Sequence, residues 1–255
     1  MTAQQVAVVS GGAKGIGAAV VARVPKDGYA VVTGSRSATP DDRDGLTMVR
    51  ADLARAEGVA ALATAALHRY GRVDALVNNV GVFPARGSFL EVTDEQWLAG
   101  FKVNMLAAIR LTRAMLPAML ESGSGTIVNV GSVNARLPFP LLVDYSAHKA
   151  ALTNLTKSLS EEFAPRGIRV NSVAPGPVRT PAWTDDGGNA DAMAAASGST
   201  RQEVLDKGVP ALGISLGRMG EAEAVADLVA FLLSGQARWI TGTDIVIDGG
   251  LVKTL

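Results

Sequence analysis

Three side chains near the middle of the chain could together move a proton to or from an oxygen atom. Tyr145 and Lys149 are four residues apart, and Ser132 stands thirteen residues before Tyr145, at the end of an apolar run. Residues 145–163 are rich in Ala and Leu and contain no Gly or Pro, which predicts a helix with positions i and i+4 on one face. The phenol and the ammonium are therefore expected to meet.

Such a pair matters because of its effect on acidity. A free tyrosine titrates near pH 10, and lowering its pKa by about 3 units needs roughly 4 kcal/mol of extra stabilisation of the phenolate. A lysine charge beside Tyr145 is one source of that stabilisation. A tyrosine tuned in this way can exchange a proton with a substrate oxygen at neutral pH. The spacing alone is also typical of an ordinary pair on a helix surface, so the rest of the chain must decide.

A glycine-rich turn follows the first apolar run. Residues 6–10 predict a short strand, residues 18–24 predict a helix, and Gly11-Gly12-Ala13-Lys14-Gly15-Ile16-Gly17 stands between them. Gly11 permits a tight turn, Gly15 lets the backbone approach a pyrophosphate, and Gly17 lets the helix pack close to the strand. Amides at the start of the helix then face the phosphates. The motif predicts a dinucleotide site, and the alternative is a structural turn without a ligand.

Both motifs, in this order and about 130 residues apart, resemble the short-chain dehydrogenase/reductase family of Rossmann-fold oxidoreductases. The resemblance covers nearly the whole chain and extends to Asp52-Leu53, Asn78-Asn79-Val80-Gly81, Asn104, Ser132, Pro175-Gly176-Pro177-Val178-Arg179-Thr180 and Asp248-Gly249-Gly250. The chain departs from the family at three places. Val80 replaces the usual Ala, Pro25 should end the first helix early, and residues 37–46 are too short for a full crossover helix.

The resemblance implies roles for four catalytic residues. Tyr145 is the general acid in reduction, Lys149 lowers its pKa and holds the nicotinamide ribose, and Ser132 polarises the carbonyl, where negative charge grows as hydride arrives. Asn104 is expected to position a water that relays protons to Lys149, although a polar residue that only caps or kinks a helix is the alternative. The implied cofactor contacts are Gly11, Lys14, Gly15, Ile16, Gly17, Ser35, Arg36, Asp52, Leu53, Asn79, Gly81, Tyr145, Lys149, Pro175, Gly176, Val178 and Thr180.

The choice between NADPH and NADH depends on the end of the second predicted strand. NAD-binding Rossmann sites place a carboxylate there, which holds the ribose hydroxyls and would repel a 2′-phosphate. Here Ser35 takes that position, with Arg36 beside it and Lys14 in the glycine turn. Each charge-assisted hydrogen bond to a 2′-phosphate would contribute roughly 1.5 to 3 kcal/mol. NADP (NADPH) is therefore the predicted cofactor; NAD is the less favoured one, and both cations are ordinary solvated charges in the alternative interpretation.

Seven apolar runs of strand length alternate with helical segments, at residues 6–9, 30–33, 46–49, 75–77, 126–130, 169–173 and 244–247. This order predicts an α/β fold, a Rossmann-type doubly wound parallel sheet of seven strands with helices on both faces. With 255 residues and 48% hydrophobic residues, one domain over residues 1–255 suffices. Thr93 and Gln96 form a capping pattern for a long helix towards Leu120.

Residues 181–216 interrupt this regularity. They are rich in Gly, Ala, Ser and Asp and too polar for a core. A connection this long inside a domain is usually functional or mobile, so we predict a lid over the active site with one short helix near residues 201–207. A surface insertion without a role is the alternative.

The predicted substrate pocket is mostly apolar with one amide. Its expected lining is Phe83, Val133, Asn134, Pro138, Phe139, Leu142 and Trp183. This composition favours a hydrophobic ketone or a secondary alcohol, and it leaves aromatic or polycyclic compounds, fatty acyl thioesters and cyclic terpenoids open. The predicted activity is the reversible, NADPH-dependent reduction of such a ketone. An NAD-dependent secondary-alcohol dehydrogenase is the runner-up, followed by a dinucleotide-sensing protein without turnover, which would not need the four catalytic residues.

Composition disfavours several other classes of function. The 24 basic and 24 acidic residues balance to zero net charge, which removes the electrostatic argument for a nucleic-acid partner. No apolar run approaches the roughly 18 residues of a membrane span, and no apolar leader precedes the first strand, so a cytoplasmic protein without a membrane partner is expected. There is no cysteine, and His68 and His148 lack the carboxylate clusters of a metal site.

Assembly is predicted only by resemblance. The family resemblance implies a homo-oligomer, specifically a tetramer, and Ala147, Ala150, Ala151 and Leu155 could form a close-packing helix face for it. The alternative for this face is simple packing onto the sheet.

Overall fold

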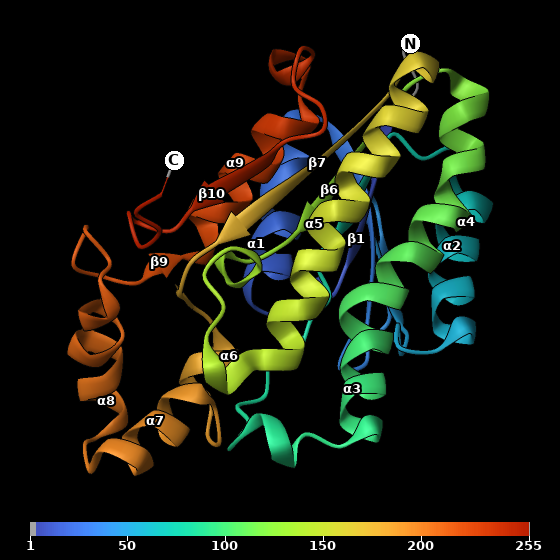
Figure 1. The fold of residues 1–255 in the computed structure, drawn as a ribbon. Coiled ribbons are helices and arrows are strands. Elements are labelled where there is room, and N and C mark those ends of the chain that lie inside the picture. Colours follow the sequence, from blue (N-terminus) through green and yellow to red (C-terminus); the bar gives the residue numbers. More distant parts are fainter. Residues whose placement is uncertain (1–3, 255) are drawn as a thin grey trace.

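A twisted sheet of eight strands crosses the centre of the protein, with helices on both of its faces (Figure 1). The structure is a computed structural model, and it describes residues 4–254. In chain order the strands are β1 (Gln5–Ser10), β2 (Tyr29–Ser35), β3 (Asp41–Arg43), β4 (Leu46–Arg50), β5 (Ala75–Asn78), β6 (Gly125–Val130), β7 (Ile168–Pro175) and β10 (Asp244–Ile247). Their order in the sheet is β10-β7-β6-β5-β1-β2-β4-β3. The α/β prediction is thus confirmed, and all seven expected strands are present and parallel.

The predicted strand count of seven was one too low. The segment of residues 37–46, which is too short for a crossover helix, contains the edge strand β3, which pairs antiparallel with β4. Its three residues are Asp41, Asp42 and Arg43, and they lack the apolar alternation from which strands are recognised. A short, charged edge strand also gives little surface for unwanted pairing with another chain.

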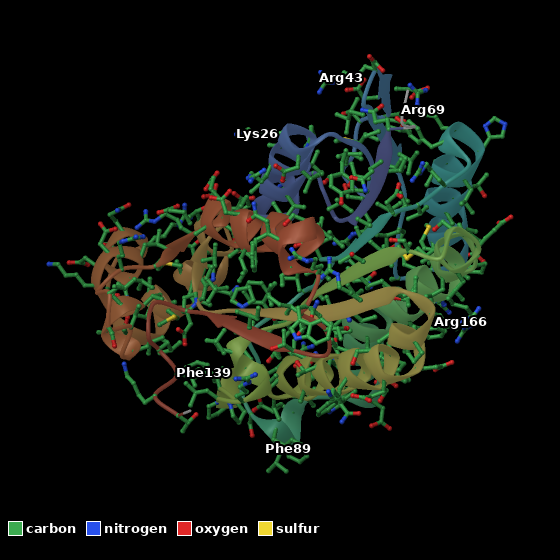
Figure 2. All side chains as sticks on the ribbon, turned by 90° about the horizontal axis from the view of Figure 1, so that it is seen from above. Lys26, Arg43, Arg69, Phe89, Phe139 and Arg166 are labelled. Carbon is green, nitrogen blue, oxygen red and sulfur yellow. The ribbon has the colours of Figure 1, made fainter. Side chains whose placement is uncertain are left out.

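Alternate residues of the central strands face two separate hydrophobic layers, as the period of two requires. Val6 and Val8 of β1 pack with α2 (Ala56–Tyr70) and α4 (Ala107–Ser122). Ala7 and Val9 pack on the other face with α1 (Gly15–Arg23) and α9 (Ala222–Leu233). Figure 2 shows the charged ends of Lys26, Arg43, Arg69 and Arg166 at the periphery of this arrangement.

Local signals set the helix boundaries. Helix α1 ends at Arg23, and Pro25 follows in a 3₁₀ turn, Val24–Asp27, as expected. Helix α3 (Asp94–Phe101) begins with both halves of the predicted capping box between Thr93 and Gln96. It continues through a π turn, Lys102–Leu106, into α4. By length and composition alone the combined helix Asp94–Ser122 could cross a membrane, but half of its most apolar window is buried inside the fold, as in a core helix.

The segment of residues 181–216 is more helical than expected. It holds α6 (Pro181–Thr184), α7 (Asn189–Ser197) and α8 (Arg201–Glu203), followed by a π turn, Val204–Gly208, and a 3₁₀ turn, Pro210–Leu212. The helix expected near residues 201–207 is present, whereas α6 and α7 were missed because Gly187, Gly188 and Gly198 break the pattern on both sides of an Ala-rich run. A small apolar cluster around Val204 and Leu205 holds the segment together.

Strand β8 (Val178–Arg179) pairs with β9 (Gly220–Glu221) and ties the two ends of this segment to each other. Figure 1 shows α6, α7 and α8 at one edge of the molecule, next to the carboxyl ends of the strands. That place fits a lid, which remains a prediction.

Candidate active site

A cavity of about 2100 Å³ opens along the carboxyl ends of the parallel strands. It runs from the glycine turn after β1, past the ends of β5, β6 and β7, to the helices of residues 181–216. Open α/β sheets bind ligands at this edge, where neighbouring crossovers leave on opposite faces. Every residue of the sequence-based site lines this cavity except Gly17 and Asn104, which lie behind its wall.

The glycine turn has the shape that a dinucleotide site needs. Gly11 adopts φ of 72°, a left-handed conformation that other residues rarely take. A side chain at Gly17 would place its Cβ 2.2 Å from the carbonyl oxygen of Gly11, so only glycine allows the helix to start this close to the strand. Asn79, after β5, donates to the carbonyl oxygen of Ser10 at 2.9 Å and holds the turn in place.

The far end of the cavity carries cationic and hydroxyl groups. Ser35 ends β2 with a buried hydroxyl oxygen that has no hydrogen-bond partner, and Arg36 beside it is exposed. Arg50 was not predicted, yet β2 and β4 pair in register and put it directly opposite Ser35. The Arg50 guanidinium donates to the carbonyl oxygen of Arg36 at 3.2 Å. Lys14 was expected to contact the 2′-phosphate of NADPH. In the structure its ammonium forms an ion pair with Asp185 of the predicted lid, at 3.3 Å.

Asp52 lines the same end of the cavity beside Leu53. One of its carboxylate oxygens accepts from the amide of Ala54 at 3.2 Å, and the other lies 3.5 Å from Arg55. These contacts fix the direction of the carboxylate. Together with the unpartnered hydroxyl of Ser35 and the glycine turn, they fit the adenosine and pyrophosphate parts of a nicotinamide dinucleotide.

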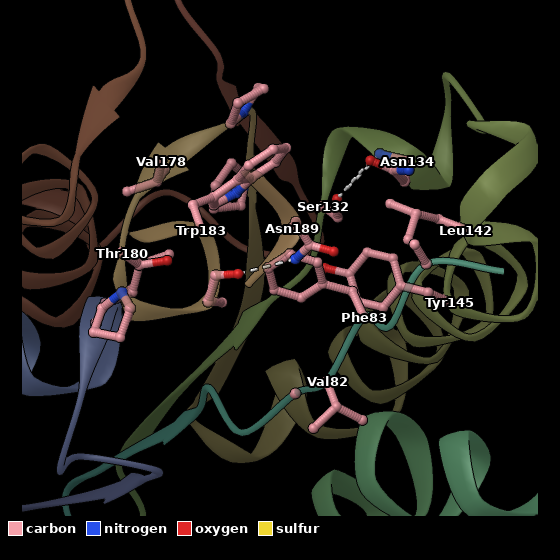
Figure 3. A pocket seen from close by; sticks show the side chains of 18 of the residues that line it. Val82, Phe83, Ser132, Asn134, Leu142, Tyr145, Val178, Thr180, Trp183 and Asn189 are labelled. Carbon is pink, nitrogen blue, oxygen red and sulfur yellow. Dashed lines mark hydrogen bonds between the residues drawn. The ribbon is translucent and has the colours of Figure 1, made fainter. Parts of the chain in front are cut away.

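Ser132 and Tyr145 lie close together at the middle of the cavity (Figure 3), and Lys149 lines the same space. Ser132 follows β6, and the other two lie one turn apart on α5 (Val143–Phe163), as the spacing predicts. The Lys149 ammonium lies 5.6 Å from the centre of the Tyr145 ring and donates to the carbonyl oxygen of Val130 at 2.6 Å. Lys149 is only 2% exposed, whereas Tyr145 is half-buried.

The acidities of this pair differ from the sequence-based expectation. Burial raises the pKa of Tyr145 to about 12, and the nearby Ser132 hydroxyl lowers it only in part. Burial also lowers the pKa of Lys149 to about 8. The acidic phenol expected from the Tyr145–Lys149 spacing is therefore not what the folded chain produces, because removal of the ring from water raises the pKa more than the Ser132 hydroxyl lowers it.

Asn104 lies inside the π turn that joins α3 to α4, and it is buried behind Gly81. Its side-chain oxygen accepts from the amide of Val82 at 2.8 Å, and its side-chain nitrogen donates to the Val82 carbonyl at 2.9 Å. These bonds hold the loop that follows β5. A π turn is often found at functional sites, and the predicted water relay through Asn104 stays a prediction.

The substrate end of the cavity is mainly apolar. The ring of Phe83 lies 5.5 Å from the ring of Tyr145, tilted by 45°. The other predicted lining residues, Val133, Asn134, Pro138, Phe139, Leu142 and Trp183, surround the same space. Figure 3 shows Asn134, Leu142, Trp183 and Phe83 around Tyr145 and Ser132.

The wall next to the expected nicotinamide is formed by the residues after β7. Pro175, Gly176, Val178 and Thr180 all line the cavity. A side chain at Gly176 would place its Cβ 2.8 Å from the Cα of Asp248, so glycine is needed for this close approach of two backbones.

Sequence reasoning missed several lining residues. Arg86, Asn189, Met193 and Lys207 also line the cavity, in addition to Arg50. The positive charges of Arg50, Arg86 and Lys207 were visible in the sequence, but they gave no sign of the position of these residues. Within residues 4–254, no group of three or more His, Asp or Glu side chains could hold a metal ion.

The sheet, the glycine turn and the Tyr145–Lys149 pair at one cavity define a Rossmann-type oxidoreductase that uses a nicotinamide dinucleotide. Comparisons with known proteins identify the family. The family model described as Enoyl-(Acyl carrier protein) reductase matches residues 11–252. Dehydrogenase/reductase SDR family member 4 of Sus scrofa is 34% identical over 264 residues, covering 98% of this chain and 88% of the relative. The chain therefore belongs to the short-chain dehydrogenase/reductase (SDR) family and is an NAD(P)-dependent oxidoreductase acting on CH–OH or C=O groups.

Two solved structures show the same fold. L-sorbose reductase from Gluconobacter frateurii, in complex with NADPH and L-sorbose, has a TM-score of 0.89 at 29% identity and covers 99% of this chain and 98% of its own. The 3-ketoacyl-(acyl-carrier-protein) reductase from Brucella melitensis, in complex with NADH, has a TM-score of 0.84 at 29% identity and covers 98% of both chains. Similar proteins thus bind either form of the cofactor.

Proposed function

We propose that this protein reduces a hydrophobic ketone to a secondary alcohol with NADPH, in a reversible reaction. The observation that carries the proposal is the meeting of Ser132, Tyr145 and Lys149 in a cavity that begins at the glycine turn and ends between apolar walls. Both solved relatives described above are reductases by their names, which supports the direction of the reaction.

When bound between the glycine turn and Lys149, NADPH would supply the hydride that the carbonyl carbon accepts. In this direction Tyr145 must donate a proton to the carbonyl oxygen, and a pKa of about 12 keeps its phenol protonated at neutral pH. Ser132 donates a hydrogen bond to the same oxygen and stabilises the charge that grows there. Lys149, with a pKa near 8, is mostly charged at pH 7 and favours the loss of the proton from Tyr145 at the moment of transfer.

The walls of the cavity support an apolar substrate. Phe83 lies against Tyr145, and Leu142, Phe139 and Trp183 line the space beyond. A pocket of this kind binds by excluding water from apolar surface, with few polar groups to orient the substrate. The size of the cavity, about 2100 Å³, leaves room for a bulky ketone beside a dinucleotide.

The preference for NADPH rests on the end of β2. Ser35 replaces the carboxylate that NAD-specific Rossmann sites place there, and Arg36 and Arg50 bring two guanidinium groups beside it. Lys14 supports the preference for NADPH less than expected, because its ammonium is already paired with the carboxylate of Asp185.

The test is a screen for NADPH oxidation against ketones of increasing size and apolarity, with NADH run in parallel and Tyr145→Phe as the inactive control. An enoyl thioester and a β-ketoacyl thioester belong on the panel because of the family description and the Brucella relative. Turnover of apolar ketones with NADPH supports the proposal. Turnover of sugars alone, or of every substrate better with NADH, contradicts it.

We also propose that the protein forms a homotetramer through α5. Ala147, Ala150 and Ala151 are exposed in the single chain and do not pack onto the sheet, while Leu155 is half-buried against Met105 and Ala108. Small side chains of this kind let two helices approach closely. Light scattering measures the mass of the assembly directly, and a monomer would contradict the proposal.

A further inference from the structure

A buried ion pair connects the loop after β5 to the helix that carries the catalytic tyrosine. Asp144 directly precedes Tyr145 and is only 2% exposed. One of its carboxylate oxygens accepts from the backbone amide of Tyr145 at 2.9 Å. The other accepts from two nitrogens of the Arg86 guanidinium, at 2.5 and 3.2 Å. The pair therefore bonds to the backbone of the tyrosine itself.

Arg86 is attached to the same region through its backbone as well. Its amide donates to the carbonyl oxygen of Leu141 at 2.8 Å, in the segment that enters α5. Further back in the loop, Asn104 bonds to both backbone groups of Val82. Between these two attachment points lies Phe83, whose ring contacts the ring of Tyr145. The loop is thus fixed on both sides of Phe83, whose ring lies against the ring of the catalytic tyrosine.

The electrostatics agree with an ionised pair. Burial raises the pKa of Asp144, but the hydrogen bonds from Arg86 and from the Tyr145 amide outweigh it and hold this pKa below its ordinary value. Loss of Arg86 would leave a buried carboxylate without its counter-ion, next to Tyr145. The N-terminal turn of α5 would then have to move or take up water to satisfy that charge.

We infer that Arg86 and Asp144 are positioning residues, which hold Tyr145 and Phe83 in register for proton transfer to the substrate. This inference rests on the proposed function for its effect on turnover. Misplacement of a reacting group by about 1 Å can reduce a rate by roughly 100-fold, even when the mutated residue does not touch the reacting atoms. Neither residue is assigned a chemical step, since the guanidinium is occupied by Asp144.

The test compares Arg86→Met, Arg86→Lys, Asp144→Asn and the Arg86→Met/Asp144→Asn double variant. Arg72→Met is the matched control, because Arg72 and Asp74 form a similar, partly buried pair at 2.6 Å before the amino end of β5, away from the cavity. We expect Arg86→Met to lower kcat roughly 10- to 100-fold, with KM and the Kd for NADPH changed by less than about threefold. Arg86→Lys should recover most of the rate, and the double variant should be no worse than the worse single variant.

A second measurement does not depend on turnover. Amide hydrogen exchange in residues 82–88 and 141–147 should become faster together in Arg86→Met and in Asp144→Asn, but not in Arg72→Met. If no ketone is reduced by the wild type while exchange still rises in both segments, the proposed function fails and the positioning role stands. Unchanged exchange in these segments overturns the inference. So does a kcat that stays at the wild-type value in all four variants while only thermal stability falls.

Discussion

The Lys149 ammonium lies 5.6 Å from the centre of the Tyr145 ring and donates to the carbonyl oxygen of Val130 at 2.6 Å. The lysine is thus anchored to Val130 at the end of β6, two residues before Ser132. Burial shifts both pKa values away from their usual ones, upward for the half-buried Tyr145 and downward for the fully buried Lys149. The acid form of the tyrosine is therefore the resting form.

Replacement of Tyr145 by phenylalanine should stop the reduction without affecting the cofactor. The variant loses the phenol hydroxyl that lies beside Ser132 and Lys149 in the cavity, so kcat should fall by about 10²- to 10⁴-fold. The Kd for NADPH, measured by cofactor fluorescence, should stay within about twofold, because the ring and its packing on Phe83 remain. A variant that keeps more than a tenth of the activity would refute the role of the phenol.

The pH dependence of reduction should report Lys149. Its pKa of about 8 means that the ammonium loses its proton as the pH rises through 8, while Tyr145, with a pKa of about 12, remains protonated over the same range. We expect kcat/KM for the ketone to decrease above pH 8, because kcat/KM reports the groups of the free enzyme. Lys149→Met should be slow at every pH and lack this decrease. If kcat/KM decreases only above pH 10, the decrease does not report Lys149 and the prediction is contradicted.

Acid sensitivity should come in part from His148. Burial lowers its pKa from the ordinary value of 6.5, assisted by Lys149 and Arg86 and opposed by Asp144. The folded state then binds fewer protons than the unfolded state below pH 6.5, so this group favours unfolding as the pH falls from 6.5 towards its lowered pKa. Above pH 6.5 its contribution is constant.

This prediction is checked with His148→Phe, which keeps an aromatic ring against Trp97 and Phe101. The free energy of unfolding in urea, measured between pH 5 and 7.5, should decrease less steeply with acidity in the variant than in the wild type. Equal slopes would show that His148 does not titrate in this range.

The glycine turn should tolerate no side chain at Gly17. A Cβ there would lie 2.2 Å from the Gly11 carbonyl oxygen, so the strand and the helix must separate, and the amides facing the pyrophosphate move with them. We expect Gly17→Ala to weaken NADPH binding about tenfold or more, which corresponds to about 1.4 kcal/mol. Gly235→Ala is the control, since nothing lies within 4 Å of its Cβ position and its φ is not positive.

Arg36 and Arg50 should separate the two cofactors. Replacing both by alanine removes the cations beside Ser35, so the Kd for NADPH should rise by about tenfold, a modest value because both guanidinium groups are exposed. The Kd for NADH, which has no 2′-phosphate, should change by less than about twofold. Parallel losses for both cofactors would mean that the two arginines only stabilise the edge of the sheet.

The short-range features of the protein could be predicted from its sequence. The strands of the parallel sheet are apolar runs, and the Thr93–Gln96 capping box is encoded within four residues. The glycine turn is recognisable because its glycines stand where the backbone is left-handed or too crowded for a side chain. The Tyr145–Lys149 pair also follows from helix geometry alone. Each of these signals is complete within a few neighbouring residues, which is why the sequence by itself determined the seven parallel strands and the catalytic helix.

Only the tertiary structure decided which distant residues meet. The register of β2 against β4 places Arg50 opposite Ser35, and the loop after β5 brings Arg86 to Asp144 across 58 residues of sequence. The direction of the tyrosine pKa was decided in the same way, since burial depends on every element that surrounds the ring and not on the lysine one turn away. Strand pairing, charge pairing between loops and the exclusion of water are properties of the folded chain, and no local pattern carries them.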